Sequence, residues 1–184
     1  MNKTLCCMSL GHAVLISQQY GLGRTNTVGL SAFLSKMKYF YARVTHDHDK
    51  SEKYLRAVLR QCCLIAVIYL KMEHYPHSIL ENVIAFTKTD IYPSLFSEQE
   101  VFNIANEIRP HTIASKRVER TLTICNNFIN SIQDRVHVII SLPSALRPHQ
   151  LVHLFRQHTQ LYTDFYVDIY KPLNNQTLNS IARY

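Results

Sequence analysis

Residues 13–27 read AVLISQQYGLGRTNT, and this stretch decides the fold. Its first five residues, Ala13–Ser17, are apolar or small and predict a buried strand. A turn with two glycines, Gly21 and Gly23, comes next, and a helix is predicted to start directly after it. Ligands of parallel α/β sheets sit at the carboxyl ends of strands, usually at the first strand-to-helix loop. The sequence therefore predicts an α/β fold with a candidate ligand site at this loop.

The rest of the chain alternates between apolar runs and helical patterns. Five runs predict strands, at Ala13–Ser17, Tyr39–Val44, Leu64–Leu70, Val136–Leu142 and Phe165–Ile169. Among the patterns between them, Leu30, Phe33, Leu34 and Met37 follow helical spacing, and Ser97 with Glu100 predicts a capping box. This order predicts one α/β domain over residues 1–184, a three-layer fold with a parallel sheet of about five strands and helices on both faces.

The composition restricts the kinds of partner that we expect for this protein. Of the 184 residues, 47% are hydrophobic and 18% charged, which is typical of a folded domain. The net charge is +7, but the lysines and arginines are scattered, so we expect no nucleic-acid partner. The apolar part of Met1–Ser17 is too short to span a membrane, and we expect no membrane partner. Five cysteines, an odd number, predict reduced thiols in a cytosolic protein.

The glycine loop has part of a phosphate-binding pattern. Such a loop needs glycines, a lysine for the β- and γ-phosphates, and a Ser or Thr for magnesium. Gly23-Arg24-Thr25 has arginine in place of lysine, and Gln18 stands where the first glycine is expected. A purely structural turn explains two glycines equally well, but the position between strand and helix favours a damaged phosphate-binding loop.

The acidic residues needed for hydrolysis are missing. They are expected at the end of the third strand, where they hold magnesium and polarise water. Lys71 occupies the expected aspartate position, and Glu73 is the only nearby carboxylate. We therefore expect no catalytic residues and no magnesium-dependent hydrolysis. The histidines and aspartates of residues 46–49 (HDHD) resemble a metal cluster, but we interpret them as an exposed polar turn, and no metal site is predicted.

Several segments, in order, resemble the dynein heavy chain, most closely its fourth AAA+ module. They are GHAVLI at 11–16, GLGRTN at 21–26, LSAFL at 30–34, IYPSLFSEQE at 91–100, VHVIISLP at 136–143, VDIY at 167–170 and LNSIA at 178–182. The resemblance implies the large α/β subdomain of an AAA+ P-loop NTPase, as a fragment of a much larger heavy chain of a divergent dynein heavy chain domain-containing protein.

The resemblance also implies residue roles. The vestigial nucleotide-binding loop comprises Gly21, Gly23, Arg24, Thr25 and Asn26, with Arg24 at the lysine position and Thr25 at the magnesium-ligand position. Ser141 or Ser144 lies near the first sensor, Arg156 near the second-sensor arginine with Arg147 as a competitor, and Glu73 is a possible acidic substitute. ATP or ADP with magnesium would bind weakly or not at all.

The resemblance implies a structural or allosteric module of a microtubule motor ring in the cytoplasm, cytoskeleton or cilium. Its partners would be neighbouring AAA+ modules and, indirectly, the dynein complex and microtubules. Two alternatives stay open. One is an independent P-loop NTPase-like enzyme with Arg24 on the phosphates and Glu73 as the acid. The other is a basic interaction domain that binds acidic partners or nucleic acid.

Overall fold

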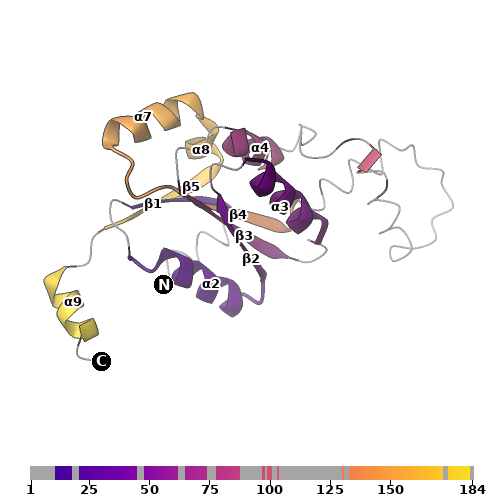
Figure 1. Ribbon diagram of the computed structural model, residues 1–184. Coiled ribbons are helices and arrows are strands. Elements are labelled where there is room, and N and C mark those ends of the chain that lie inside the picture. The colour runs from indigo at the N-terminus through magenta and orange to yellow at the C-terminus, as the bar shows by residue number, and fades with distance from the viewer. Residues whose placement is uncertain are drawn as a thin grey trace.

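A five-stranded sheet, parallel throughout, forms the centre of the computed structural model (Figure 1). The structure describes residues 11–17, 21–44, 48–61, 65–73, 78–87, 97, 99–100, 103, 130, 133–171 and 174–182. The strand order is β2-β3-β4-β1-β5. The strands are β1 (His12–Ser17), β2 (Lys38–Val44), β3 (Ala66–Met72), β4 (Val136–Ser141) and β5 (Phe165–Tyr170).

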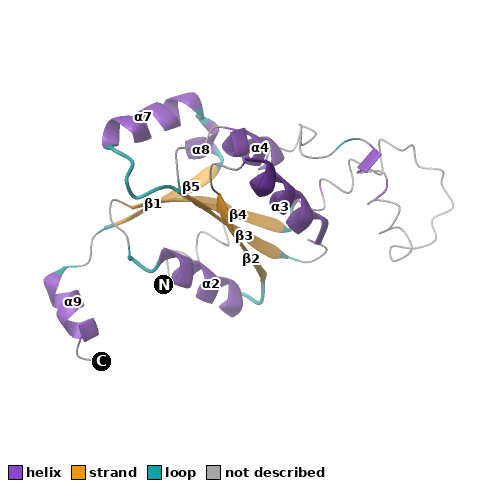
Figure 2. Cartoon of the chain, in the orientation of Figure 1, coloured by secondary structure: helices purple, strands orange, loops and turns teal. Residues whose placement is uncertain are grey.

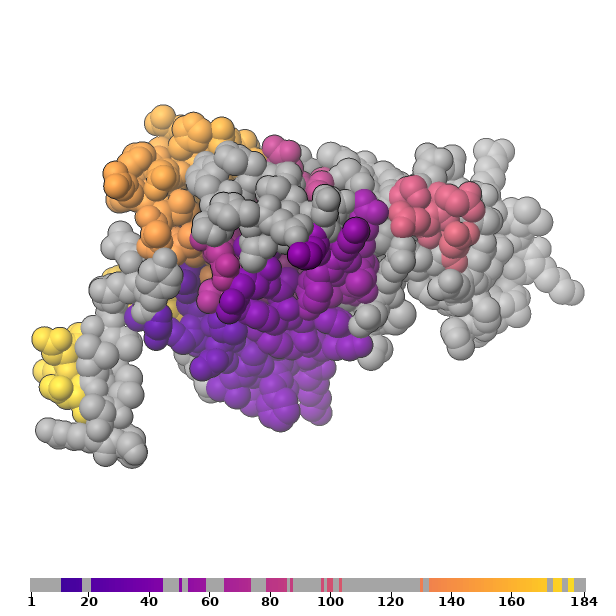
Figure 3. All heavy atoms as spheres, in the orientation of Figure 1, coloured from indigo at the N-terminus to yellow at the C-terminus, as the bar shows by residue number. Residues whose placement is uncertain are grey.

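Helices cover both faces of this sheet (Figure 2). One face carries α2 (Arg24–Leu34). The other carries α3 (His48–Gln61), α4 (Ser78–Thr87), α7 (Pro148–Gln157) and the short α8 (Gln160–Thr163). The last helix, α9 (Asn175–Ala182), lies apart from the sheet in the ribbon and sphere views (Figures 1 and 3). The prediction of a three-layer α/β fold is confirmed.

The hydrophobic core has two parts because the central strands are buried on both faces. On β3, five consecutive residues from Ala66 to Leu70 are at most 1% exposed. Ala66, Ile68 and Leu70 face α3 and α4, whereas Val67 and Tyr69 face α2. A continuous apolar run is the expected sequence of such a strand, so all five predicted strands agree with the structure to within about two residues.

The helix α2 packs on the sheet through its small side chains. Its buried residues are Val28, Ser31 and Ala32, and they meet a layer of tyrosines on β2 and β3. Leu30, Phe33 and Leu34 remain 47%, 76% and 50% exposed. Their spacing therefore predicts the helix correctly but does not identify its buried face. Met37 lies beyond the end of the helix and packs against the same core.

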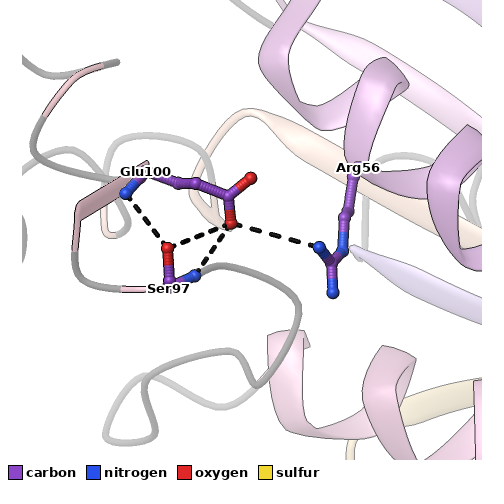
Figure 4. Close-up of polar contacts among 3 residues, drawn as sticks. All are labelled: Arg56, Ser97 and Glu100. Carbon is purple, nitrogen blue, oxygen red and sulfur yellow. Dashed lines mark hydrogen bonds and ion pairs between the residues drawn. The ribbon is translucent and has the colours of Figure 1, made fainter.

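The predicted capping box is confirmed (Figure 4). The Glu100 N–H donates to Ser97 Oγ at 3.2 Å, and the Ser97 N–H donates to Glu100 Oε2 at 3.0 Å. Arg56 of α3 places Nη1 4.0 Å from the same carboxylate oxygen. This ion pair connects α3 to a segment more than 40 residues later in the chain. No helix among the described residues is long and apolar enough to cross a membrane.

Two histidines lie at the amino ends of β1 and β4. The Val138 N–H donates to His12 Nδ1 at 3.1 Å, and His137 Nδ1 lies 3.1 Å from the Gly11 carbonyl oxygen. Burial and the neighbouring His137 together lower the pKa of His12 to about 4, while Asp164 opposes the shift. His12 is therefore neutral in the folded protein at neutral pH, and its Nδ1 can accept the backbone hydrogen bond.

We expect His12 to make the protein less stable in mild acid. Between pH 6.5 and about 4 the unfolded chain takes up a proton that folded His12 resists, so the free energy of unfolding falls as the pH falls. The loss approaches about 3 kcal/mol at the lower end. Urea unfolding at several pH values measures it. His12→Asn, whose amide oxygen can still accept from the Val138 N–H, should flatten the dependence of stability on pH. His149→Asn, at an exposed position of α7, should leave that dependence unchanged. Equal slopes in all three proteins would contradict the assignment.

Candidate phosphate-binding site

The loop between β1 and α2 lies at the carboxyl ends of the strands. Adjacent strands β1 and β4 send their following helices, α2 and α7, to opposite faces of the sheet. A crevice at such a switch point is the usual ligand position of an open parallel sheet. Gly21 and Gly23 adopt φ values of +77° and +70°, which only glycine adopts readily. The two glycines thus fit a tight loop at the position where a ligand is expected.

The amino end of α2 has backbone N–H groups without a partner within the helix. Gly23 is the N-cap, no side chain caps the helix, and its first turn contains no acidic residue. The first helical hydrogen bond runs from the Thr27 N–H to the Gly23 carbonyl oxygen at 2.8 Å. The N–H groups of residues 24–26 precede that bond and have no partner within the helix. An anion is the natural ligand of such an end, because the helix dipole adds positive potential there.

Arg24 connects α2 to the segment after β4. Its Nη1 donates to the Leu142 carbonyl oxygen at 3.0 Å, and its Nη2 donates to Ser144 Oγ at 2.8 Å. The structure therefore brings together two predicted site residues, Arg24 and Ser144, that are 120 positions apart. Both acceptors are neutral, so these contacts leave the positive charge of the guanidinium uncompensated.

Thr25 faces a phenol. Its Oγ1 lies 3.5 Å from the hydroxyl of Tyr69, which is 1% exposed. The Tyr69 ring stacks between those of Tyr39 and Tyr41, with centroid distances of 6.5 and 5.8 Å. A magnesium-ligating hydroxyl is expected beside a carboxylate from this strand. The tyrosine supplies no negative charge there.

Strand register places a row of residues across the α2 face of the sheet. Leu15 of β1 pairs with Ser141 of β4, Ser141 pairs with Lys71 of β3, and Lys71 pairs with Arg43 of β2. On the other side of β1, Leu15 pairs with Asp168 of β5. Neighbouring strands are about 4.8 Å apart, so Lys71 lies beside Ser141. On the other side, Asp168 lies two strands from Ser141.

Ser141 carries a buried hydroxyl without a partner. The residue is 1% exposed, and its Oγ has no hydrogen bond among the described residues. A buried, unpaired hydroxyl costs about 1–3 kcal/mol relative to a paired one. A bound water or ion is one explanation of such a group in a folded protein.

Glu73 forms an ion pair with Arg43. Its Oε1 lies 3.0 Å from Arg43 Nε on the neighbouring strand. A hydrogen bond with the Tyr41 side chain raises the pKa of Arg43, and the charge of Glu73 adds to that shift. The only carboxylate that the sequence offered as an acidic substitute therefore already has a counter-ion.

The remaining predicted residues lie away from these contacts. Asn26 is exposed on the first turn of α2, and Arg147 is exposed at the start of α7, where its N–H donates to Gln150 Oε1 at 2.9 Å. Arg156 lies on α7 beside an open apolar groove of about 410 Å³, lined also by Leu151, Phe155 and Tyr162. Neither arginine forms a described contact with Arg24, Thr25 or Ser141.

No metal centre was found in the described ranges. They contain no group of three or more His, Cys, Asp or Glu side chains that could hold a metal ion. Residues 46 and 47 of the HDHD segment lie outside the described residues. The helix α3 begins at His48, so the second half of the segment is helical and the predicted turn is wrong for that half.

The family follows from comparison with known proteins. Residues 5–184 match the family described as P-loop containing dynein motor region D4. The chain belongs to this family. A P-loop containing dynein motor region is consistent with the observed parallel sheet.

Two curated relatives agree with this assignment. The chain is 25% identical over 180 residues to "Dynein heavy chain domain-containing protein 1" of Mus musculus, covering 94% of this chain and 4% of that protein. It is 22% identical over 138 residues to "Dynein-1-beta heavy chain, flagellar inner arm I1 complex" of Chlamydomonas reinhardtii, covering 72% of this chain and 3% of that protein. The chain thus corresponds to a small part of each relative and is a dynein-like AAA module.

The sequence analysis missed two features of this dynein motor region module. One is Tyr69, whose hydroxyl meets Thr25; its place two residues before Lys71 on a strand puts both on one face. The other is the ion pair of Glu73 with Arg43, which depends on the register between β2 and β3. Alternation within the strand was a signal for the first, and no sequence signal identifies the second.

Two glycine substitutions should change stability in opposite directions. A Cβ at Gly23 meets nothing within 4 Å, so Gly23→Ala is penalised only by the positive φ and should cost about 1 kcal/mol. Gly29 has an ordinary helical φ, and a Cβ there would be 3.8 Å from the Tyr39 ring, so Gly29→Ala should stabilise by about 0.5–1 kcal/mol. Urea unfolding measures both, and a stabilising Gly23→Ala would contradict the loop geometry.

Removing the Arg24 contacts should destabilise the protein. Arg24→Met loses both hydrogen bonds to the segment after β4, and we expect a cost of about 1–2 kcal/mol because the guanidinium is only partly buried. Arg147→Met, at an exposed position nearby, removes the same charge and should change stability by less than about 0.5 kcal/mol. Equal effects of the two variants in urea unfolding would show that the Arg24 contacts contribute nothing specific.

Proposed function

We propose that this dynein-like module does not hydrolyse ATP and has a structural or allosteric role within a larger heavy chain. The observation that carries the proposal is the positive charge of Lys71 near the end of β3, with no free carboxylate from Glu73. Lys71 stands where the sequence predicts the magnesium-binding acid, and Glu73 is paired with Arg43 at 3.0 Å. Thr25, at the expected magnesium-ligand position, meets the Tyr69 phenol. Together these residues supply no free carboxylate to hold a metal or polarise water.

The proposal extends to the cellular setting. One relative is named as a dynein heavy chain domain-containing protein, and the other as a heavy chain of a flagellar inner arm complex. We propose that the chain works beside neighbouring AAA+ modules in a dynein complex and takes part in microtubule-based movement in the cytoplasm or a cilium. In that setting it would transmit or brace rigid-body shifts of a ring. Nucleotide, if bound there, would bind weakly.

The independent enzyme is the weaker alternative. It needs Glu73 as a free acid, and the contact with Arg43 opposes that role. A basic interaction domain has no described feature in its favour beyond the net charge of +7.

Phosphate release from ATP tests the proposal. With magnesium present, the purified chain should give no turnover above a protein-free blank, because Lys71, Glu73 and Thr25 supply no free carboxylate to activate water. The sample should be compared with an Arg24→Ala variant to exclude a contaminating ATPase. Turnover by the wild-type chain that disappears in Arg24→Ala would show that the site is catalytic and would overturn the proposal.

A further inference from the structure

We propose that the site binds a polyphosphate anion without a divalent cation, and that the Lys71 ammonium supplies the positive charge that a metal would otherwise supply. The inference deepens the proposed function and rests on it, since it shares the premise that the site has no free carboxylate to hold a metal. It names the ligand class, a free polyphosphate such as that of a nucleotide, and it assigns a use to Lys71.

The charge distribution at the crevice carries the first part of the argument. Lys71 lies in the row beside Ser141, and Arg24 reaches the segment after β4. Neither cation has an ion-pair partner among the described residues. The carboxylate of Glu73 is paired with Arg43, and Asp168 lies beyond β1 in the same row. Two uncompensated cations near one loop favour an anion and oppose a divalent metal.

The buried hydroxyl of Ser141 carries the second part. Its Oγ is enclosed and unpaired, on the same face of the sheet as α2 and directly beside Lys71. A hydroxyl can donate to a phosphate oxygen, and a hydrogen bond to a charged group is stronger than one to a neutral group. A polyphosphate that reaches Ser141 would therefore satisfy a group that is otherwise unpaired.

The amino end of α2 supplies the remaining donors. No described side chain caps the N–H groups of residues 24–26, and Gly21 and Gly23 both adopt positive φ in the loop. A phosphate at this end would accept hydrogen bonds from the backbone N–H groups. Lys71 and Ser141 lie on the sheet face that α2 covers. Both a nucleotide and an inorganic polyphosphate offer this chemistry, so the experiment includes both.

Calorimetric titration of the 184-residue chain tests the inference. ATP and tripolyphosphate are each titrated in EDTA and in excess magnesium. Both should bind at least as tightly in EDTA, because magnesium removes two negative charges from the polyphosphate and so weakens its attraction to Lys71. Equal affinities for the two ligands indicate recognition of the phosphates alone, and tighter ATP binding indicates that the nucleoside adds contacts. Binding only with magnesium, or no binding in either condition, would overturn the inference.

Lys71→Met should weaken binding in EDTA about tenfold or more, since it removes a charge-assisted contact. Lys53→Met, at an exposed position of α3, gives the protein the same net charge as Lys71→Met, and its affinity should stay within about twofold of wild type. Lys71→Gln, which keeps a polar side chain, repeats the test if Lys71→Met does not fold. Wild-type affinity in a folded Lys71 variant would overturn the role of this lysine.

Ser141→Ala separates a ligand role from a packing role. Without ligand it should raise the melting temperature, because it removes a buried unpaired hydroxyl. In the titration it should weaken binding about threefold or more. A lower melting temperature with unchanged binding would overturn the ligand role of Ser141. Detection of ATP turnover, in contrast, would overturn the proposed function and leave the result in EDTA to decide the inference separately.

Discussion

The packing of α2 against the tyrosine layer is the contact on which the candidate site depends. The rings of Tyr39, Tyr41 and Tyr69 occupy the α2 face of β2 and β3, so the helix can approach only with small side chains. Val28 and Ala32 provide them, and Gly29 lies against the Tyr39 ring. This contact fixes the axis of α2 and therefore the place of its amino end at the carboxyl ends of the strands. A larger residue on this face would move the loop away from β4.

The position of α2 in turn decides which groups can meet. Because β1 lies between β4 and β5, the first turn of α2 is near the segment after β4, and the Arg24 guanidinium reaches Leu142 and Ser144. The same position brings Thr25 to the Tyr69 hydroxyl. Burial raises the pKa of Tyr39, and Tyr69 adds to that shift, so this phenol stays neutral. The layer below the loop is thus polar at its tips but contributes no negative charge.

The sequence predicted the strands well because their pattern is set by burial alone. The run on β3 is apolar at nearly every position, and two-sided burial requires that in any parallel sheet. The buried face of α2 was harder, because bulky tyrosines on the facing strands exclude Leu30 and Phe33, and the helix sequence does not contain that information. The partners of Arg24 and Glu73 depend on strand order and register, which no local pattern encodes.

The buried core is separate from the side chains at the strand ends, so such a fold can persist when the charges at the strand ends differ. The residues that bury β1 and β4, such as Leu15 and Ile139, lie within the sheet layer, one or more residues before the strand ends. Lys71 lies near the end of β3, where its ammonium can reach water, so a charge there costs little folding stability. A lysine rather than an acid at that position attracts anions instead of cations, and it leaves the packing that holds α2 on the sheet unchanged. Folding constrains the tyrosine layer and the small face of α2, whereas the chemistry depends on a few side chains at the strand ends.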